Sequence, residues 1–194
     1  GNPTFEVMRF FAPQIESSEI LNRLELKPKG YILVTAHRSE NVDNPRYLGS
    51  IFEAMAALAE RFGLPIVYPM HPRTRDKIES IPVHRMINIM PPLGFYDFNR
   101  LLKESFCVLS DSGTAAEEGL FYGVPNVSLR MVTERIETLE SGATIVSGMS
   151  VENIIESVVT AVSIPWSARY EFEEDHSPSS VVVNAIRTQI TNFF

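Results

Sequence analysis

The chain has 194 residues, 44% of them hydrophobic and 21% charged, with a formal net charge of −7 at pH 7. This composition fits one globular domain and excludes a disordered, fibrous or disulfide-built protein. The negative charge argues against nucleic acid as the main partner, and no run approaches the roughly 18 apolar residues of a membrane span.

Apolar, β-branched runs alternate with helical patterns along the chain. The strand-like runs are GYILVTAH (30–37), LPIVYPMH (64–71), MINIM (86–90), FCVLS (106–110), PNVSLR (125–130) and ATIVSG (143–148). Helical patterns cover residues near 44–62, near 96–104, the stretch after Ser112, 151–162 and a tail at 178–194. Strands that alternate with helices predict an α/β fold with a doubly wound, Rossmann-like parallel sheet.

Two local features support this interpretation. Asn44 and Pro45 are a typical cap and first residue of the helix near 44–62, and Gly63 is a typical end. The only cysteine, Cys107, lies in an apolar run, which predicts a buried residue in a reducing compartment and therefore a cytoplasmic protein.

Polar residues follow the predicted strands at the points where they end. They are His37 and Arg38, then His71, then Asp111, Ser112 and Gly113, and finally Arg130. In open α/β sheets, ligands bind outside the carboxyl ends of the strands. Because cationic and hydrogen-bonding residues gather at this edge, the pattern predicts an anionic ligand.

The stretch LSDSGTAAEEGLFYGVP (109–125) indicates how such an anion is bound. Ser112 and Gly113 open a predicted helix whose free N–H groups and positive dipole end attract a phosphate. Glu118 follows five residues after Gly113, a rise of roughly 7.5 Å along a helix. That position suits a carboxylate that accepts hydrogen bonds from a ribose diol attached to the phosphate.

Structural alternatives remain open for each residue taken singly. Ser112 can be only a helix cap, a histidine at a strand end can be a satisfied structural residue, and Arg38 can be ordinary surface charge. The chain lacks the phosphate-loop, G-x-G-x-x-G and G-x-S-x-G motifs. A single cysteine and the absence of a close histidine pair argue against a metal site, so we expect neither a metal nor a cofactor.

Four motifs carry a resemblance to a known family. They are VTAHRSEN (34–41), IVYPMHPR (66–73), LSDSGTAAEE (109–118) and LRMVTER (129–135), and in this order they resemble the non-hydrolysing UDP-N-acetylglucosamine 2-epimerases. The resemblance implies a two-domain GT-B fold of which residues 1–194 are the UDP-binding C-terminal domain, without the N-terminal domain. Since the family's acid and base carboxylates lie in that absent domain, we expect this chain alone to bind UDP weakly and not to epimerise.

The resemblance also implies roles for individual residues. His37 matches the active-site histidine near the diphosphate, Ser112, Gly113 and Thr114 the phosphate-binding loop, Glu118 the ribose contact, Phe98 the uracil-packing aromatic and Arg135 the arginine of the TER motif. Arg38, Glu40 and His71 match positions that hold a second, activating UDP-sugar in some members. Ser39 replaces an arginine of the usual motif and so removes one cation from that second region.

The implied reaction converts UDP-N-acetylglucosamine to UDP-N-acetylmannosamine by elimination and re-addition of UDP, for bacterial polysaccharide synthesis, in a homodimeric full-length enzyme. Three alternatives stay open: a 2-epimerase that forms UDP-N-acetyl-L-fucosamine, the donor-binding domain of a GT-B glycosyltransferase, and a non-catalytic nucleotide-binding module. His37 within HRSEN and the TER motif argue against the glycosyltransferase.

The tail at 178–194 is expected to form a helix with an apolar stripe at Val182, Ile186, Ile190 and Phe193. In GT-B proteins the last helix returns to the first domain. The stripe is therefore expected to be exposed here or packed on a neighbouring chain.

Overall fold

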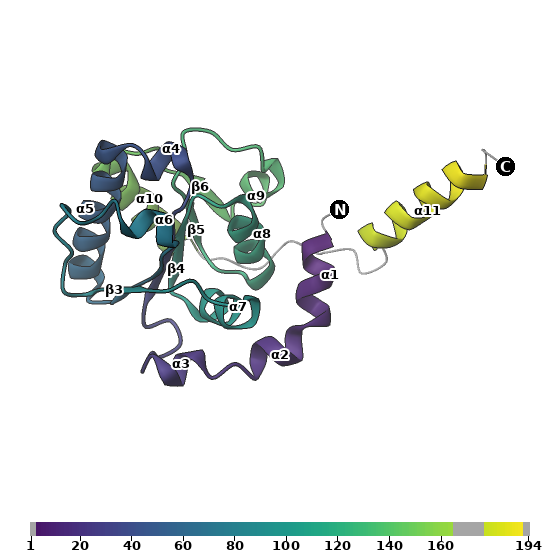
Figure 1. Ribbon diagram of the computed structural model, residues 1–194, viewed down its shortest axis with the longest axis horizontal. Helices are drawn as coiled ribbons and strands as arrows, with labels where there is room; N and C mark the ends of the chain where they lie inside the picture. The colour runs from purple at the N-terminus through teal and green to yellow at the C-terminus, as the bar shows by residue number, and fades with distance from the viewer. Residues whose placement is uncertain (1–2, 165–176, 192–194) are drawn as a thin grey trace.

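The computed structural model describes residues 3–164 and 177–191, and its centre is a six-stranded parallel sheet (Figure 1). The strands are β1 (Ile32–Thr35), β2 (Ile66–Pro69), β3 (Ile87–Met90), β4 (Cys107–Ser110), β5 (Asn126–Ser128) and β6 (Thr144–Val146). Their order across the sheet is β3-β2-β1-β4-β5-β6, and every pair is parallel. The chain therefore adds β2 and β3 on one side of β1, and then crosses back to add β4, β5 and β6 on the other side. In doubly wound folds this switch point between β1 and β4 is where ligands bind.

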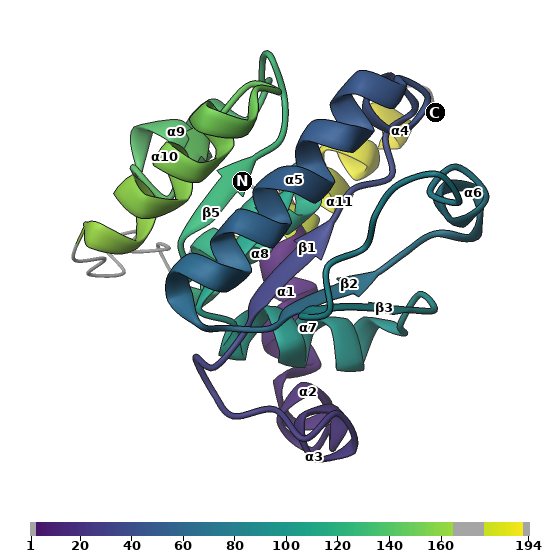
Figure 2. The same cartoon turned by 90° about the vertical axis from the view of Figure 1, so that its left-hand side faces the viewer.

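Helices cover both faces of the sheet, which confirms the predicted doubly wound, Rossmann-like fold. On one face lie α5 (Pro45–Phe62) and α10 (Val151–Ser163), which contact each other, and on the other lie α7 (Phe95–Glu104) and α8 (Gly113–Tyr122) (Figures 1 and 2). Strand β1 is buried between them: Ile32 and Val34 pack into the α5 side and Leu33 into the α7 side. Cys107, expected in the core, is fully buried.

The longest helix, α5, begins and ends where its sequence predicts. The Asn44 side chain accepts hydrogen bonds from the backbone N of Arg46 at 3.0 Å and of Tyr47 at 3.3 Å. Gly63 ends the helix with a φ of 65°, a conformation that costs glycine little. The predicted stripe is buried at Ile51, Met55 and Leu58, while Tyr47, its fourth member, is only half-buried.

Six further helices have no counterpart in the sequence-based expectation. Three precede the sheet, α1 (Pro3–Phe10), α2 (Ala12–Glu16) and α3 (Ile20–Arg23), and they contact α7 and α8. The other three are short helices that follow β1, β2 and β5: α4 (Ser39–Val42), α6 (Pro72–Arg75) and α9 (Ile136–Glu140). Of the last three, α4 and α9 matter for the site because the loops that contain them carry Arg38 and Arg135.

The predicted tail helix is α11 (Pro178–Thr191), which extends away from the sheet in Figure 1. Residues 192–194 and the side chains of Ile190 and Phe193 lie outside what the structure describes. The stripe residues Val182 and Ile186 are each 54% exposed, so the described part of the stripe faces solvent as expected. Within the described ranges, no helix combines the length and apolarity needed to cross a membrane.

Candidate functional site

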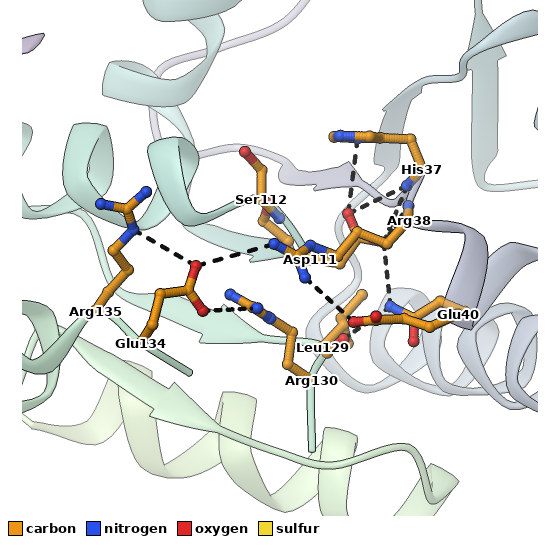
Figure 3. A network of polar contacts seen from close by, with 11 residues as sticks. His37, Arg38, Glu40, Asp111, Ser112, Leu129, Arg130, Glu134 and Arg135 are labelled. Atoms are coloured by element: carbon orange, nitrogen blue, oxygen red, sulfur yellow. Dashed lines mark hydrogen bonds and ion pairs between the residues drawn. The ribbon is translucent and has the colours of Figure 1, made fainter. Parts of the chain in front are cut away.

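The candidate site lies at the carboxyl edge of the sheet, where β1 and β4 run side by side. Asp111, directly after β4, is fully buried, and its carboxylate accepts hydrogen bonds from the backbone N of His37 at 3.0 and 3.1 Å and of Arg38 at 2.8 Å (Figure 3). The His37 ring is half-exposed, with Nδ1 at 3.6 Å from the same carboxylate. Asp111 therefore fixes the backbone from which His37 projects toward solvent.

Asn41 extends this network to a third loop. Its side chain is buried and donates through Nδ2 to Asp111 at 3.1 Å and to the backbone oxygen of Leu129, just after β5, at 2.9 Å. A buried carboxylate is costly unless donors surround it, and here backbone and amide N–H groups supply them. The Asp111 carboxylate and the Asn41 side chain thus hold together the loops after β1, β4 and β5.

Helix α8 begins at this network. Ser112 is its cap: the hydroxyl lies 3.5 Å from the backbone N of Ala115, at the outer limit of a hydrogen bond. A Cβ on Gly113 would lie 2.8 Å from Nε of Arg135, so glycine is what allows that guanidinium to lie against the start of the helix. Thr114 is exposed in the first turn. The cap role left open for Ser112 is therefore realised, and it coexists with an arginine at the positive end of the helix dipole.

Three arginines surround one carboxylate beside this helix. Glu134 accepts a hydrogen-bonded ion pair from Nη2 of Arg130 at 2.8 Å, and Nε of Arg135 and Nη2 of Arg38 lie 3.8 and 4.0 Å from it (Figure 3). The Arg130 contact holds the pKa of Glu134 below its usual value. The arrangement gathers three guanidinium groups at the edge of the sheet where an anionic ligand is expected.

Two further glutamates flank the arginines. Arg135 also pairs through Nη1 with the mostly buried Glu117 at 2.9 Å, and Arg38 pairs through Nη1 with Glu40 at 3.3 Å. Because Glu117 and Glu134 contact different parts of Arg135, they hold its side chain from two sides. Loss of one of these contacts would leave the other in place.

Glu118 lies in the second turn of α8 and is buried, with 6% of its surface exposed. Burial raises its pKa to about 7; the side-chain amide of Asn99 acts in the opposite direction and the neighbouring Glu117 adds a small increase. Phe98 lies on the adjacent helix α7, half-buried against the apolar cluster that includes Leu101. The structure thus places the predicted ribose and uracil contacts on neighbouring helices.

The structure brings some of the predicted residues together and separates another. His37, Arg38 and Arg135 share the polar network of Figure 3, and Ser112 lies beside it at the start of α8. His71 instead caps α6, where its Nδ1 accepts a hydrogen bond from the backbone N of Arg73 at 3.2 Å. In the part of the chain that the structure describes, no hydrogen bond or ion pair joins His71 to Arg38 or Glu40, which pair with each other.

Several residues of the site received no individual role from the sequence, although Asp111 and Arg130 were among the polar residues expected at the strand ends. They are Asn41, Asn99, Asp111, Glu117, Arg130 and Glu134. Five of them stand inside the quoted motifs: Asn41 ends HRSEN, Asp111 and Glu117 belong to LSDSGTAAEE, and Arg130 and Glu134 belong to LRMVTER. That shared location was the available signal, but it did not reveal that Asp111 binds backbone groups.

Comparisons with known proteins agree with this geometry. The family described as UDP-N-acetylglucosamine 2-epimerase matches residues 1–179. A UDP-2,3-diacetamido-2,3-dideoxy-D-glucuronate 2-epimerase of Pseudomonas aeruginosa is 38% identical over 133 residues, which are 69% of this chain and 37% of that protein. A UDP-N-acetylglucosamine 2-epimerase of Methanocaldococcus jannaschii is 37% identical over 134 residues, which are 66% of this chain and 37% of the relative.

Solved structures match over more of the chain. The M. jannaschii UDP-GlcNAc 2-epimerase in complex with UDP-GlcNAc and UDP superposes with a TM-score of 0.77 and 31% identity, covering 84% of this chain and 47% of that one. The Neisseria meningitidis UDP-GlcNAc 2-epimerase bound to UDP-GlcNAc has a TM-score of 0.77 and 27% identity, covering 97% and 54%. The chain thus spans about half the length, or less, of the proteins it matches, which have the GT-B fold. By its motifs, its fold and these matches, the chain belongs to the UDP-N-acetylglucosamine 2-epimerase family.

Proposed function

We propose that this chain is the UDP-binding C-terminal domain of a non-hydrolysing 2-epimerase, which inverts C2 of a UDP-linked N-acetylated amino sugar. The observation that supports it most is the group of Arg38, Arg130 and Arg135 beside the start of α8 at the β1/β4 switch point. A diphosphate suits this place because guanidinium groups and a helix N-terminus both favour phosphate oxygens.

The proposed reaction needs a site that stabilises departing UDP. In the elimination step a base removes the proton from C2, a double bond forms between C1 and C2, and the bond between C1 and the diphosphate breaks, so that negative charge grows on the β-phosphate. Arg135 and the N–H groups at the start of α8 stabilise that charge, and His37 lies beside it with its backbone held by Asp111. Re-addition of UDP after reprotonation of C2 on the other face completes the inversion.

The nucleoside part of UDP is assigned to the second turn of α8. Glu118 accepts hydrogen bonds from the ribose diol, Phe98 packs against uracil, and Ser112, Gly113 and Thr114 line the phosphates. The position of Glu118 in the second turn of α8, with Phe98 on the adjoining α7, supports a nucleotide that lies along these helices. Arg38, Glu40 and His71 are proposed as contacts of a second UDP-sugar.

The proton chemistry at C2 is assigned to residues outside this chain. The resemblance implies that the acid and base carboxylates lie in the other domain of the full-length protein, which we propose to be a homodimer. The 194-residue chain is therefore proposed to bind UDP without epimerising a UDP-sugar.

The sugar is proposed to be UDP-N-acetylglucosamine, with UDP-N-acetylmannosamine as product and bacterial polysaccharide synthesis as the role. The M. jannaschii relative is named for that substrate, whereas the P. aeruginosa relative is named for a diacetamido glucuronate. A 2-epimerase that forms UDP-N-acetyl-L-fucosamine is the second candidate, favoured by the HRSEN and DSGT variants of the motifs.

Calorimetric titration with UDP tests the proposal, with Ser112→Ala and Glu118→Ala compared with the unchanged chain. Loss of the hydrogen bonds between a charged group and the diol is expected to cost about 1.5–3 kcal/mol in the Glu118 variant. Deuterium exchange at C2 of UDP-N-acetylglucosamine by the full-length protein, without release of sugar to an acceptor, would then separate an epimerase from a glycosyltransferase or a non-catalytic module. UDP binding that neither variant weakens would contradict the proposed placement.

A further inference from the structure

Glu134 occupies the centre of the positive charge that the site otherwise offers to a ligand. Its carboxylate lies 2.8 Å from Arg130, 3.8 Å from Arg135 and 4.0 Å from Arg38, and Figure 3 marks contacts from all three arginines to it. Without a negative group at this point, three like charges would face one another. The carboxylate therefore serves the arginines as an anion in the way that a phosphate would.

The two partners of the shortest contact differ in how firmly they are held. Arg130 is 93% buried, since only 7% of its surface is exposed, and its backbone donates to Ser128 at 2.9 Å and accepts from Gly148 at 3.0 Å. Glu134 projects from the loop between β5 and α9, and 55% of its side chain is exposed. The carboxylate can therefore turn outward into solvent while the guanidinium stays in place.

Arg130 also keeps donors for a second partner. Among the residues that the structure describes, its buried Nε and Nη1 have no hydrogen-bond partner, and neither does Nε of Arg135. Buried donors of this kind are rare unless a ligand or a water satisfies them. A single carboxylate has too few oxygens to satisfy all of them, whereas a diphosphate brings more acceptors and a larger charge.

We propose that Glu134 is an internal placeholder for the diphosphate, which releases the arginines when the ligand arrives; this inference rests on the proposed function. The incoming phosphate oxygens take over Arg135 and the free donors of Arg130, and Glu134 turns out to solvent. Glu117 remains on Nη1 of Arg135, so the arginine keeps its position during the exchange.

The test is a titration of the chain and its Glu134→Gln variant with UDP and, separately, with inorganic pyrophosphate. Glutamine keeps the size of the side chain but removes the charge that competes with the ligand. We expect both ligands to bind roughly three- to tenfold more tightly to the variant, with the gain shrinking as salt rises. Glu140→Gln, which removes the same charge from an exposed position on α9, is expected to change neither affinity by more than about twofold.

Each result has a distinct meaning. Equal or weaker binding of both ligands to the Glu134 variant would overturn the placeholder while leaving UDP binding by the unchanged chain intact. Tighter binding of pyrophosphate to the variant, with no binding of UDP, would support the placeholder role of Glu134 and contradict the proposed binding of UDP. If neither ligand binds to any variant, both the placeholder and the proposed function are wrong.

Discussion

Asp111 and His37, which are 74 residues apart in sequence, are joined by hydrogen bonds from the His37 backbone N to both carboxylate oxygens. This contact joins the loops that follow β1 and β4, at the switch point where we expect the ligand to bind. It makes the conformation of the histidine loop depend on one buried charge rather than on the loop's own sequence.

Replacing Asp111 by Asn is expected to destabilise the chain because the new amide nitrogen would face backbone N–H groups that need an acceptor. A loss of about 2–4 kcal/mol in the free energy of unfolding is expected, measured by urea denaturation. Asp43→Asn is the matched control. Asp43 forms an exposed pair with Lys77, so less than about 1 kcal/mol should be lost. Equal losses in the two variants would contradict the role given to Asp111.

The stability of the chain should depend on the protonation of Glu118. Burial raises its pKa in the folded chain to about 7 from an ordinary value of 4.5, so the folded state binds this proton more tightly than the unfolded state. The resulting stability is fully present below the unfolded value and is lost as the pH rises through about 7. Glu118→Gln should therefore be more stable than the unchanged chain by roughly 2–3 kcal/mol at pH 8, and similar to it near pH 4.5.

Urea unfolding at the two pH values measures this difference. Glu53→Gln, at an exposed position on α5, provides the control and should leave the pH dependence unchanged. If the Glu118 variant is no more stable than the unchanged chain at pH 8, then ionising the buried Glu118 carboxylate does not destabilise the fold.

Gly113→Ala is expected to displace Arg135 rather than to unfold the chain. The added Cβ would lie 2.8 Å from Nε of that flexible side chain, which can move, and alanine favours a helix more than glycine does. We expect a stability change within about 1 kcal/mol, with UDP bound about tenfold more weakly because one guanidinium no longer reaches the phosphate. Gly49→Ala, with open space around its Cβ in α5, should leave UDP binding unchanged. A crystal structure of the Gly113 variant with Arg135 in its original place would refute the explanation.

The cap of α5 gives a prediction that concerns folding alone. Asn44 accepts hydrogen bonds from two otherwise unpaired N–H groups, so Asn44→Ala should lower the free energy of unfolding by about 1 kcal/mol. Asn44→Ser, which keeps an acceptor, should restore most of this loss. An alanine variant as stable as the unchanged chain would show that the cap adds nothing.

The sheet and its long helices could be predicted because burial leaves periodic patterns in sequence, as at Ile51, Met55 and Leu58, and because caps such as Asn44 are local. The short helices α4, α6 and α9 could not, since four or five residues contain too little periodicity. Part of the site could also be predicted. Its location at the strand ends followed from the fold, and the structure places His37 and Ser112 there. The partners of Asp111 were not predictable, because backbone N–H groups have no sequence signature.

The central claim is that the diphosphate of UDP binds Arg135 at the start of α8, and calorimetric titration of Arg135→Met with UDP tests it most directly. Arg61→Met, in the last turn of α5 and paired with the exposed Glu156, is the control for loss of a positive charge. We expect the Arg135 variant to bind UDP at least about tenfold more weakly and the Arg61 variant to match the unchanged chain. Equal affinities in all three proteins would contradict the claim and place the nucleotide elsewhere.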